Sequence, residues 1–136
     1  MEIVFQSFLA GFPVFIAHFA LTVSLLVAGV AVYVTITPHQ EMRLVREGNT
    51  AAAISLGGVV LGLGLPLAVS MANSVTVFDI LIWGVVSLAL QLGTFFAIDF
   101  LLRGLPKRIE EGQVASAIFL AGSKLTVAII TAAALT

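Results

Sequence analysis

The stretch that decides the fold is TAAAISLGGVVLGLGLPLAVSMA, residues 50–72, which contains no charged side chain. A helix needs about 20 mostly apolar residues to cross a hydrocarbon core roughly 30 Å thick, and this stretch meets that requirement. Three further stretches also qualify: residues 3–37, 77–102 and 114–135. Long continuous apolar runs favour helices over barrel strands, which alternate in segments of about ten residues. We therefore predict an all-α integral membrane protein with four transmembrane helices.

The composition of the whole chain agrees with a membrane protein. Of its 136 residues, 60% are hydrophobic and only 10% are charged, against about 25% charged residues in soluble domains. A net charge of −1 and six basic residues exclude a nucleic-acid-binding surface, which needs clustered Lys and Arg. The absence of cysteine excludes disulfides, thiolate metal sites and cysteine nucleophiles. We predict a single membrane domain over residues 1–136.

The first apolar stretch is longer than one crossing needs. Its Phe-rich start, with Phe5, Phe8 and Phe12, is interpreted as an interfacial or tilted lead-in. Pro13 is then expected near a kink or a helix start, where its missing N–H does least harm. The start of the chain is acidic and lacks a basic region, which argues against a secretory signal peptide.

The distribution of basic residues predicts the orientation in the membrane. Five of the six lie in the segments that join span one to span two and span three to span four: Arg43, Arg46, Arg103, Lys107 and Arg108. The connection between spans two and three holds none. Under the positive-inside rule both basic segments are cytoplasmic, and both termini lie outside the cytoplasm.

An internal repeat becomes visible when the sequence is shifted by 64 residues. Residues 47–54, EGNTAAAI, then overlie residues 111–118, EGQVASAI, with eight identities over positions 47–61. Each unit would be a helical hairpin, the first over about residues 12–72 and the second over about 77–136. Because each unit crosses the membrane twice, the two repeats are parallel-oriented, with a pseudo-two-fold axis along the membrane normal.

Small residues spaced four apart indicate where the helices approach one another closely. The pairs are Ala53 and Gly57, Gly58 and Gly62, Gly64 and Ala68, and Ala117 and Ala121. We favour packing within one chain over a dedicated dimerisation motif.

Several short motifs carry a resemblance to a known family. They are ITPHQE at 36–41, GNTAA at 48–52, Leu61-Gly62, Pro66-Leu67, Asn73, Asp79 with Trp83-Gly84, Gln91 and Ala132-Ala133. Over nearly its whole length the chain resembles the bacterial family called domain of unknown function 350, or uncharacterised protein family 0719. The resemblance implies a small inner (plasma) membrane protein, multi-pass, with no known reaction or catalytic residue. In that family's pattern the position of Lys124 is small or apolar, so a role for Lys124 would be particular to this chain or its near relatives.

Polar residues at membrane depth are the candidate binding residues, because burying them is costly. Counting from the cytoplasmic ends of the spans places Gln91 and Lys124 near the midplane, with Ser24 and Ser87 within about a turn. Three states of Lys124 remain open. In the first, desolvation makes Lys124 neutral. In the second, Lys124 reaches a water-filled cavity and hydrogen-bonds Gln91. In the third, its side chain snorkels to an interface. The cavity interpretation is favoured.

Asp99 lies about eight residues, or roughly 12 Å along a helix, nearer the cytoplasm than Lys124. We therefore expect it beyond the reach of that lysine and paired locally with Arg103 at i+4. His18, in the outer half of span one, is expected to be a packed side chain and not a metal ligand.

Three polar residues mark helix starts. Asp79 is expected in the first turn of span three, while Asn49 and Gln113 are expected to cap spans two and four.

The absence of any phosphate-binding, zinc-binding or triad motif, together with short loops, predicts a protein that is not an enzyme and has no cofactor or metal. The first functional hypothesis is a channel- or transporter-like subunit, with Gln91, Lys124, Ser24 and Ser87 lining a path. A midplane cation would favour anions, and four helices would need a homo-oligomer to form a pore.

The alternative is a membrane-anchored interaction or envelope-stress component. It would bind a cytoplasmic partner or anionic lipid at the basic end of the bilayer-embedded bundle. The residues assigned to that contact are His39, Glu41, Arg43, Arg46, Lys107 and Arg108.

Overall fold

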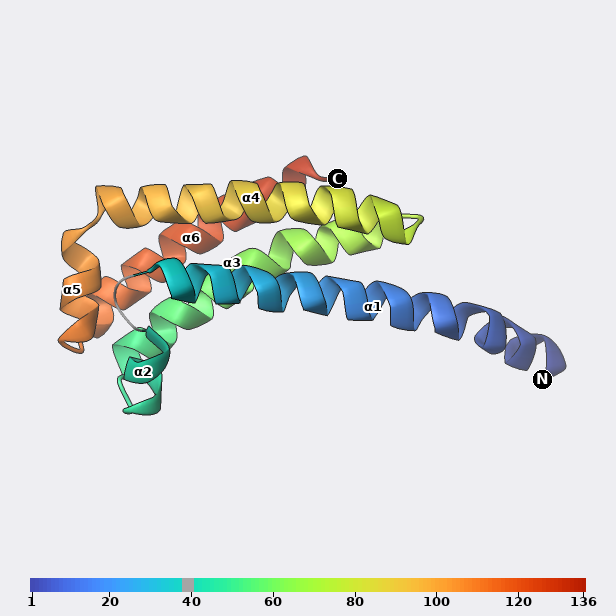
Figure 1. The fold of residues 1–136 in the computed structure, drawn as a ribbon, viewed down its shortest axis with the longest axis horizontal. Coiled ribbons are helices and arrows are strands. Elements are labelled where there is room, and N and C mark those ends of the chain that lie inside the picture. Colours follow the sequence, from blue (N-terminus) through green and yellow to red (C-terminus); the bar gives the residue numbers. More distant parts are fainter. Residues whose placement is uncertain (38–40) are drawn as a thin grey trace.

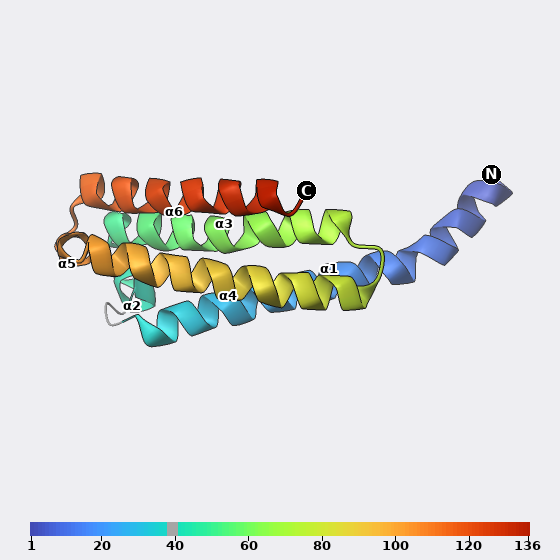
Figure 2. The same ribbon diagram turned by 90° about the horizontal axis from the view of Figure 1, so that it is seen from above.

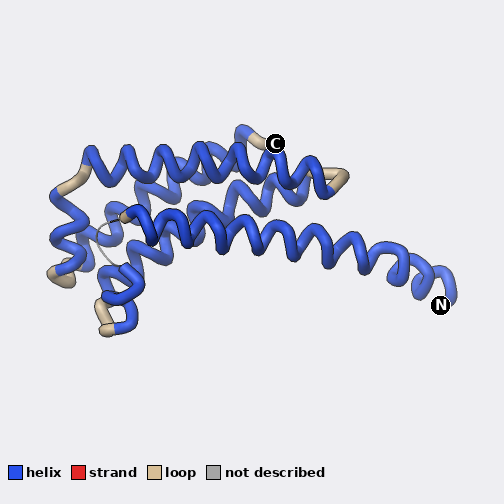
Figure 3. The backbone as a smooth tube through the Cα atoms, viewed as in Figure 1, coloured by secondary structure: helices blue, strands red, loops and turns tan. Residues whose placement is uncertain are grey.

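The chain folds entirely into helices in the part that the computed structural model describes, residues 1–37 and 41–136 (Figure 3). The six helices are α1 (Glu2–Ile36), α2 (Glu41–Arg46), α3 (Thr50–Asn73), α4 (Val77–Leu101), α5 (Gly104–Glu110) and α6 (Val114–Ala134). α1, α3, α4 and α6 are long and apolar enough to cross a membrane. Each agrees with a predicted span to within one residue at both ends. The all-α fold with four candidate membrane-spanning helices is therefore confirmed.

Two short helices, α2 and α5, occupy the segments predicted to be loops. Both lie at the same end of the long-helix bundle, which we call the α2–α5 end (Figure 1). Leu44 of α2 and Ile109 of α5 point inward and join a buried cluster with Ala52 and Leu120. Helices of six and seven residues are too short to produce a clear apolar period in the sequence, which is why they were missed.

α3 lies at the centre of the bundle, in contact with every other helix, and its closest neighbour is α6 (Figure 2). The two backbones approach at Gly58, where an added Cβ would lie 2.5 Å from the Cβ of Ala121. The prediction of close packing over small residues is therefore correct for Gly58 and Ala121. It is wrong for the pair Ala53 and Gly57, because Ala53 is exposed and a Cβ on Gly57 would meet nothing within 4 Å.

α1 is a single helix of 35 residues that extends well beyond the rest of the bundle (Figure 1). Pro13 lies inside it, so the helix-start interpretation is wrong. Figure 2 shows α1 bending in its N-terminal part, as expected where proline removes a backbone hydrogen bond. The projecting part exposes a row of stacked rings in which neighbouring centroids lie 5.2–6.5 Å apart: Phe8, Phe12, Phe15 and Phe19.

The turns that precede α3 and α6 share the same backbone conformation. Gly48 and Gly112 have φ values of 87° and 85°, a left-handed conformation that glycine adopts without steric cost. Asn49 caps α3 as predicted, its side chain accepting a hydrogen bond from the Ala52 N–H. Gln113 occupies the corresponding position before α6 but makes no side-chain cap.

The start of α4 agrees with its prediction. Asp79 lies in the first turn, where it and Thr76 exchange hydrogen bonds between side chain and backbone. This reciprocal pair satisfies two N–H groups that have no partner inside the helix.

Candidate functional site

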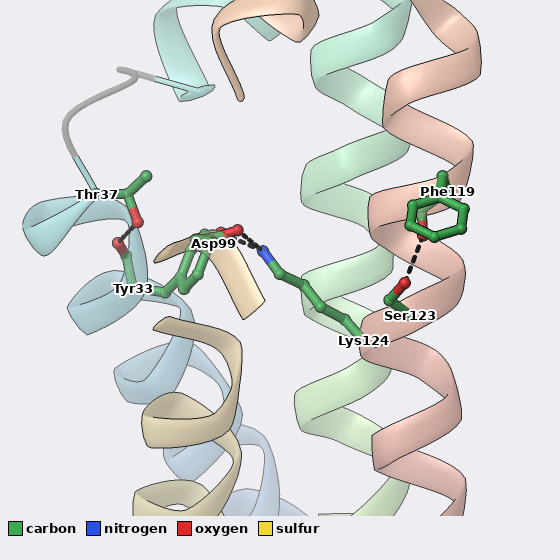
Figure 4. A network of polar contacts seen from close by, with 6 residues as sticks. All are labelled: Tyr33, Thr37, Asp99, Phe119, Ser123 and Lys124. Carbon is green, nitrogen blue, oxygen red and sulfur yellow. Dashed lines mark hydrogen bonds and ion pairs between the residues drawn. The ribbon is translucent and has the colours of Figure 1, made fainter. Parts of the chain in front are cut away.

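A buried ion pair joins two membrane-spanning helices near the α2–α5 end. The Nζ atom of Lys124 in α6 lies 2.8 Å from Oδ1 of Asp99 in α4. Lys124 is completely buried, and the Asp99 side chain is 13% exposed. Lys124 also donates to the Tyr33 hydroxyl at 2.6 Å, and that hydroxyl donates to Oδ2 of Asp99 at 2.8 Å. Side chains of α1, α4 and α6 thus form one closed polar triangle (Figure 4).

Aromatic rings surround this triangle. The ammonium group of Lys124 lies 4.7 Å from the ring centroid of Tyr33 and 5.7 Å from that of Phe95, within the range of cation–π attraction. The Tyr33 ring stacks on Phe96 with its centroid 5.6 Å away. These rings give the ion pair largely apolar surroundings, which strengthens the attraction between its charges.

The pairing of Lys124 with Asp99 corrects two predictions, that Asp99 is out of reach and that Lys124 bonds Gln91. The Cα–Cβ bond of a helical residue leans toward the helix N-terminus. α6 begins at the α2–α5 end and α4 finishes there, so Lys124 leans toward that end while Asp99 leans back toward the middle. The length of the lysine chain closes the remaining gap (Figure 4). Arg103, predicted to pair with Asp99, instead lies over the Phe100 ring at 5.6 Å.

Glu41 adds a second buried carboxylate at the same end. It is only 5% exposed, and its Oε2 atom has no hydrogen-bond partner in the described part of the chain. Burial raises the pKa of Glu41 to about 7, an effect that the charge of Lys124 opposes and that of Asp99 reinforces. The prediction that Glu41 contacts a cytoplasmic partner is therefore wrong, because its side chain faces the bundle. His39, assigned to the same contact, lies outside the described residues.

The proton on Glu41 is expected to make the stability of the protein depend on pH. The folded state binds this proton more tightly than the unfolded state, whose pKa is the ordinary 4.5. The stabilisation that this tighter proton binding provides is complete below pH 4.5 and is lost as the pH rises through 7. We expect the free energy of unfolding to fall by about 2 kcal/mol more between pH 5 and pH 8 in the wild type than in Glu41→Gln. Thermal unfolding in detergent at a series of pH values measures this. Parallel pH profiles of the two proteins would contradict it.

Gln91 is buried, as its midplane position predicted, but its partners differ from the predicted one. Its Nε2 donates to the Gly62 carbonyl oxygen at 3.0 Å, and its Oε1 accepts from the Thr131 hydroxyl at 2.7 Å. Gln91 thus links α4 to α3 and α6. The Gln91 amide bonds one carbonyl oxygen and one hydroxyl group, and neither belongs to the ion pair. Gln91 is therefore a second buried polar group, separate from the ion pair.

The other predicted polar residues divide between the core and the surface. Ser87 is 2% exposed and donates to the Gly84 carbonyl oxygen. Ser24 is exposed, so the structure does not bring it to a path with Gln91 and Lys124. His18 is half-buried in the N-terminal half of α1. Among residues 1–37 and 41–136 no group of three or more His, Cys, Asp or Glu side chains could hold a metal ion.

The basic residues of α2 and α5 form an exposed rim. Arg43, Arg46, Lys107 and Arg108 are all exposed, and Arg43 lies 3.6 Å from Glu47 in an ion pair. These helices turn Leu44, Ile109 and the Glu41 carboxylate inward and their basic side chains outward.

A cavity of about 430 Å³ borders the ion pair at the α2–α5 end. Its lining includes Thr37, Phe96, Asp99 and Arg103. Asp99 thus faces Lys124 with one oxygen while part of its side chain borders an open cavity. Sequence reasoning did not find Tyr33, Thr131 or this cavity. Tyr33 and Thr131 occur in ordinary apolar helical contexts, and neither gives a local signal.

The bundle and its buried charges define a polytopic membrane protein with an ion pair inside a mainly apolar core. The family model described as "Domain of Unknown Function (DUF350)" matches residues 7–135, and the chain belongs to that family. It is 31% identical over 122 residues to the UPF0719 inner membrane protein YjfL of Escherichia coli K12, covering 90% of this chain and 92% of YjfL. The YjfL protein of Escherichia coli O157:H7 gives the same values.

A more distant relative comes from another bacterium. The UPF0719 transmembrane protein YshE of Bacillus subtilis is 26% identical over 85 residues, which cover 62% of this chain and 63% of YshE. No solved structure matches the chain. The chain is thus a polytopic inner-membrane protein of this family, associated with the lipid bilayer.

Proposed function

We propose that the protein is a non-enzymatic channel- or transporter-like subunit in which the buried charges of Glu41, Asp99 and Lys124 carry a proton or small cation. The observation that carries this proposal is the ion pair between α4 and α6. An ion pair inside the membrane is costly to desolvate, so a functional role is the default interpretation.

The balance of charge among Glu41, Asp99 and Lys124 favours a cation over an anion as the ion that the protein carries. Asp99 neutralises Lys124, so the anion preference expected from an isolated lysine loses its basis. Glu41 supplies a further carboxylate whose Oε2 is without a partner among the described residues. With its pKa raised to about 7, Glu41 exchanges its proton at physiological pH.

Two further features support the same proposal: a cavity that reaches the ion pair, and polar groups farther along the core. The cavity beside Asp99 opens the ion pair to the α2–α5 end. Farther along the core, the Thr131 hydroxyl donates to the Gln91 amide oxygen. Hydroxyl and amide groups of this kind can pass a proton between them when water enters.

The proposed architecture is two parallel-oriented hairpin repeats. α1, α2 and α3 correspond in order to α4, α5 and α6, and the end of α2 and the start of α3 keep the offset of 64 to the end of α5 and the start of α6. The backbone bond from the Gly48 N–H to the Val45 carbonyl recurs from Gly112 to Ile109, at the same offset. The equivalent helices α3 and α6 meet at the bundle centre, which fits a pseudo-two-fold axis along the membrane normal.

The proposed orientation places the α2–α5 end in the cytoplasm and both termini outside. The four exposed basic residues of α2 and α5 support this under the positive-inside rule. We also propose a homo-oligomer, because four helices make a narrow bundle. The exposed ring row of α1 offers an apolar surface for a second copy.

Proton flux through purified protein in liposomes tests the proposal. With a pH-sensitive dye inside and a potassium-diffusion potential imposed, wild-type liposomes are expected to acidify faster than protein-free ones. The double variant Asp99→Asn, Lys124→Met, which removes both buried charges together, is expected to fall to the protein-free rate. Lys107→Met, at an exposed lysine, is the matched control and keeps the wild-type rate. Equal rates with and without protein would defeat the proposal.

A second candidate function is a membrane-anchored interaction or envelope-stress component that binds a cytoplasmic partner or anionic lipid. The exposed basic rim of α2 and α5 favours it. The same liposomes separate the two functions, because neutralising the rim leaves flux unchanged under the first function. Under the second, no charge variant alters flux.

A further inference from the structure

A second polar cavity lies at the opposite end of the bundle, away from the ion pair. Its volume is about 370 Å³, and its lining includes Ser70, Asn73, Ser74, Asp79 and Trp83. These residues come from the end of α3 and the start of α4, with the end of α6 alongside. Nothing in the proposed flux of protons depends on this cavity.

One buried hydroxyl group in the lining is left without a partner. Ser70 is 3% exposed, and its Oγ atom makes no hydrogen bond within the described residues. A buried unsatisfied hydroxyl costs free energy, and a bound polar ligand would recover it. This group therefore points to a ligand and not merely to a gap between helix ends.

The electrostatics of the cavity select a cation. The C-terminal ends of α3 and α6 carry partial negative charges, against one partial positive charge at the start of α4. Asp79 adds a carboxylate, and only its Oδ2 is engaged in the weak 3.4 Å contact with the Thr76 N–H. None of the described lining side chains is basic, so an anion would find no charged partner.

The kind of cation follows from the groups that line the cavity. A divalent metal ion requires six or more oxygen ligands, usually with several carboxylates, and Asp79 is the single carboxylate side chain in the described lining. An ammonium group instead needs hydrogen-bond acceptors and an aromatic face. Asp79 and the Ser70 hydroxyl are acceptors, and the Trp83 indole supplies the face.

We propose that this cavity binds a primary ammonium group, as carried by a phosphatidylethanolamine headgroup. The position at the ends of the spans is the depth of lipid headgroups, and the half-exposed Trp83 is a residue typical of that boundary. The ammonium group lies between Asp79 and Trp83. The Asn73 Nδ2 donates one hydrogen to the Leu135 carbonyl oxygen at 3.3 Å, and its second hydrogen can bond the adjoining phosphate. A free amine shares the ammonium chemistry but lacks the phosphate contact.

Trp83 is the only tryptophan in the chain, so its fluorescence reports directly on the cavity. Detergent-solubilised wild-type protein is titrated with phosphatidylethanolamine, with phosphatidylglycerol of the same acyl chains, and with ethanolamine. We expect a saturable change in emission with phosphatidylethanolamine and none with phosphatidylglycerol. Saturation by ethanolamine at equal concentration would assign the site to soluble amines, whereas weaker binding assigns it to the lipid.

The matched variant is Asp79→Asn, whose side-chain oxygen still caps α4 but carries no charge. Loss of the charge-assisted contact is expected to weaken binding about tenfold. Circular dichroism checks that the variant stays folded. Identical responses to the two lipids in the wild type would overturn the proposal without any variant, and so would unchanged affinity in folded Asp79→Asn. A failure here leaves the proton-flux result unaffected, because the two sites lie at opposite ends.

Discussion

Lys124→Met is expected to lower the free energy of unfolding by about 3–5 kcal/mol, because it leaves a buried carboxylate without its counter-charge. Methionine keeps most of the lysine volume, so the loss is electrostatic and not a cavity effect. Asp99 and Tyr33 both lose their shared partner in this variant. Thermal unfolding followed by circular dichroism in detergent measures the change.

A double-mutant cycle separates this effect from general damage. Asp99→Asn combined with Lys124→Met removes both charges, so it is expected to recover most of the stability lost by either single change. Lys107→Met, at an exposed lysine on α5, is the control and is expected to change stability by less than about 0.5 kcal/mol. Additive losses in the double variant would mean that the two side chains do not form a pair.

Gly58→Leu is expected to destabilise the protein by more than about 3 kcal/mol, since one added methyl group in a packed core already costs about 1–3 kcal/mol. An added Cβ at Gly58 would lie 2.9 Å from the Cα of Ala121, which is backbone and cannot move aside as a side-chain tip can. α3 and α6 must then separate. The same thermal unfolding measurement reports the loss.

The neighbouring glycine provides a matched control on the same helix. A Cβ at Gly57 would meet nothing within 4 Å, so Gly57→Leu adds an apolar side chain to an open face. Leucine is also a better helix former than glycine by several tenths of a kcal/mol. We expect Gly57→Leu to be neutral or stabilising. Similar losses in the two variants would show that the α3–α6 contact is not as close as described.

The long helices and their caps could be predicted from the sequence, because these features are local. Apolar run length placed four spans to within a residue, and Asn49 and Asp79 were recognised by residue type and position. α2 and α5 could not be predicted, since so few residues give no period.

The partners of Lys124 could not be found in the same way. Counting residues along helices gave the depth of its Cα but not the direction in which the side chain leans. Tyr33 is 91 residues away in the chain, and its hydroxyl completes the triangle only after α1 packs on α3 and α4. Pairing across helices depends on tertiary packing, which hydropathy does not encode.

The ion pair also bears on how the chain enters the bilayer. Asp99 and Lys124 sit on the two arms of one hairpin, α4 and α6, joined by α5. Each arm alone would carry an uncompensated charge into hydrocarbon, whereas the two arms together form a charge-balanced unit. Insertion of the second hairpin as a unit therefore avoids the cost of its separate arms, and docking of α1 then supplies Tyr33.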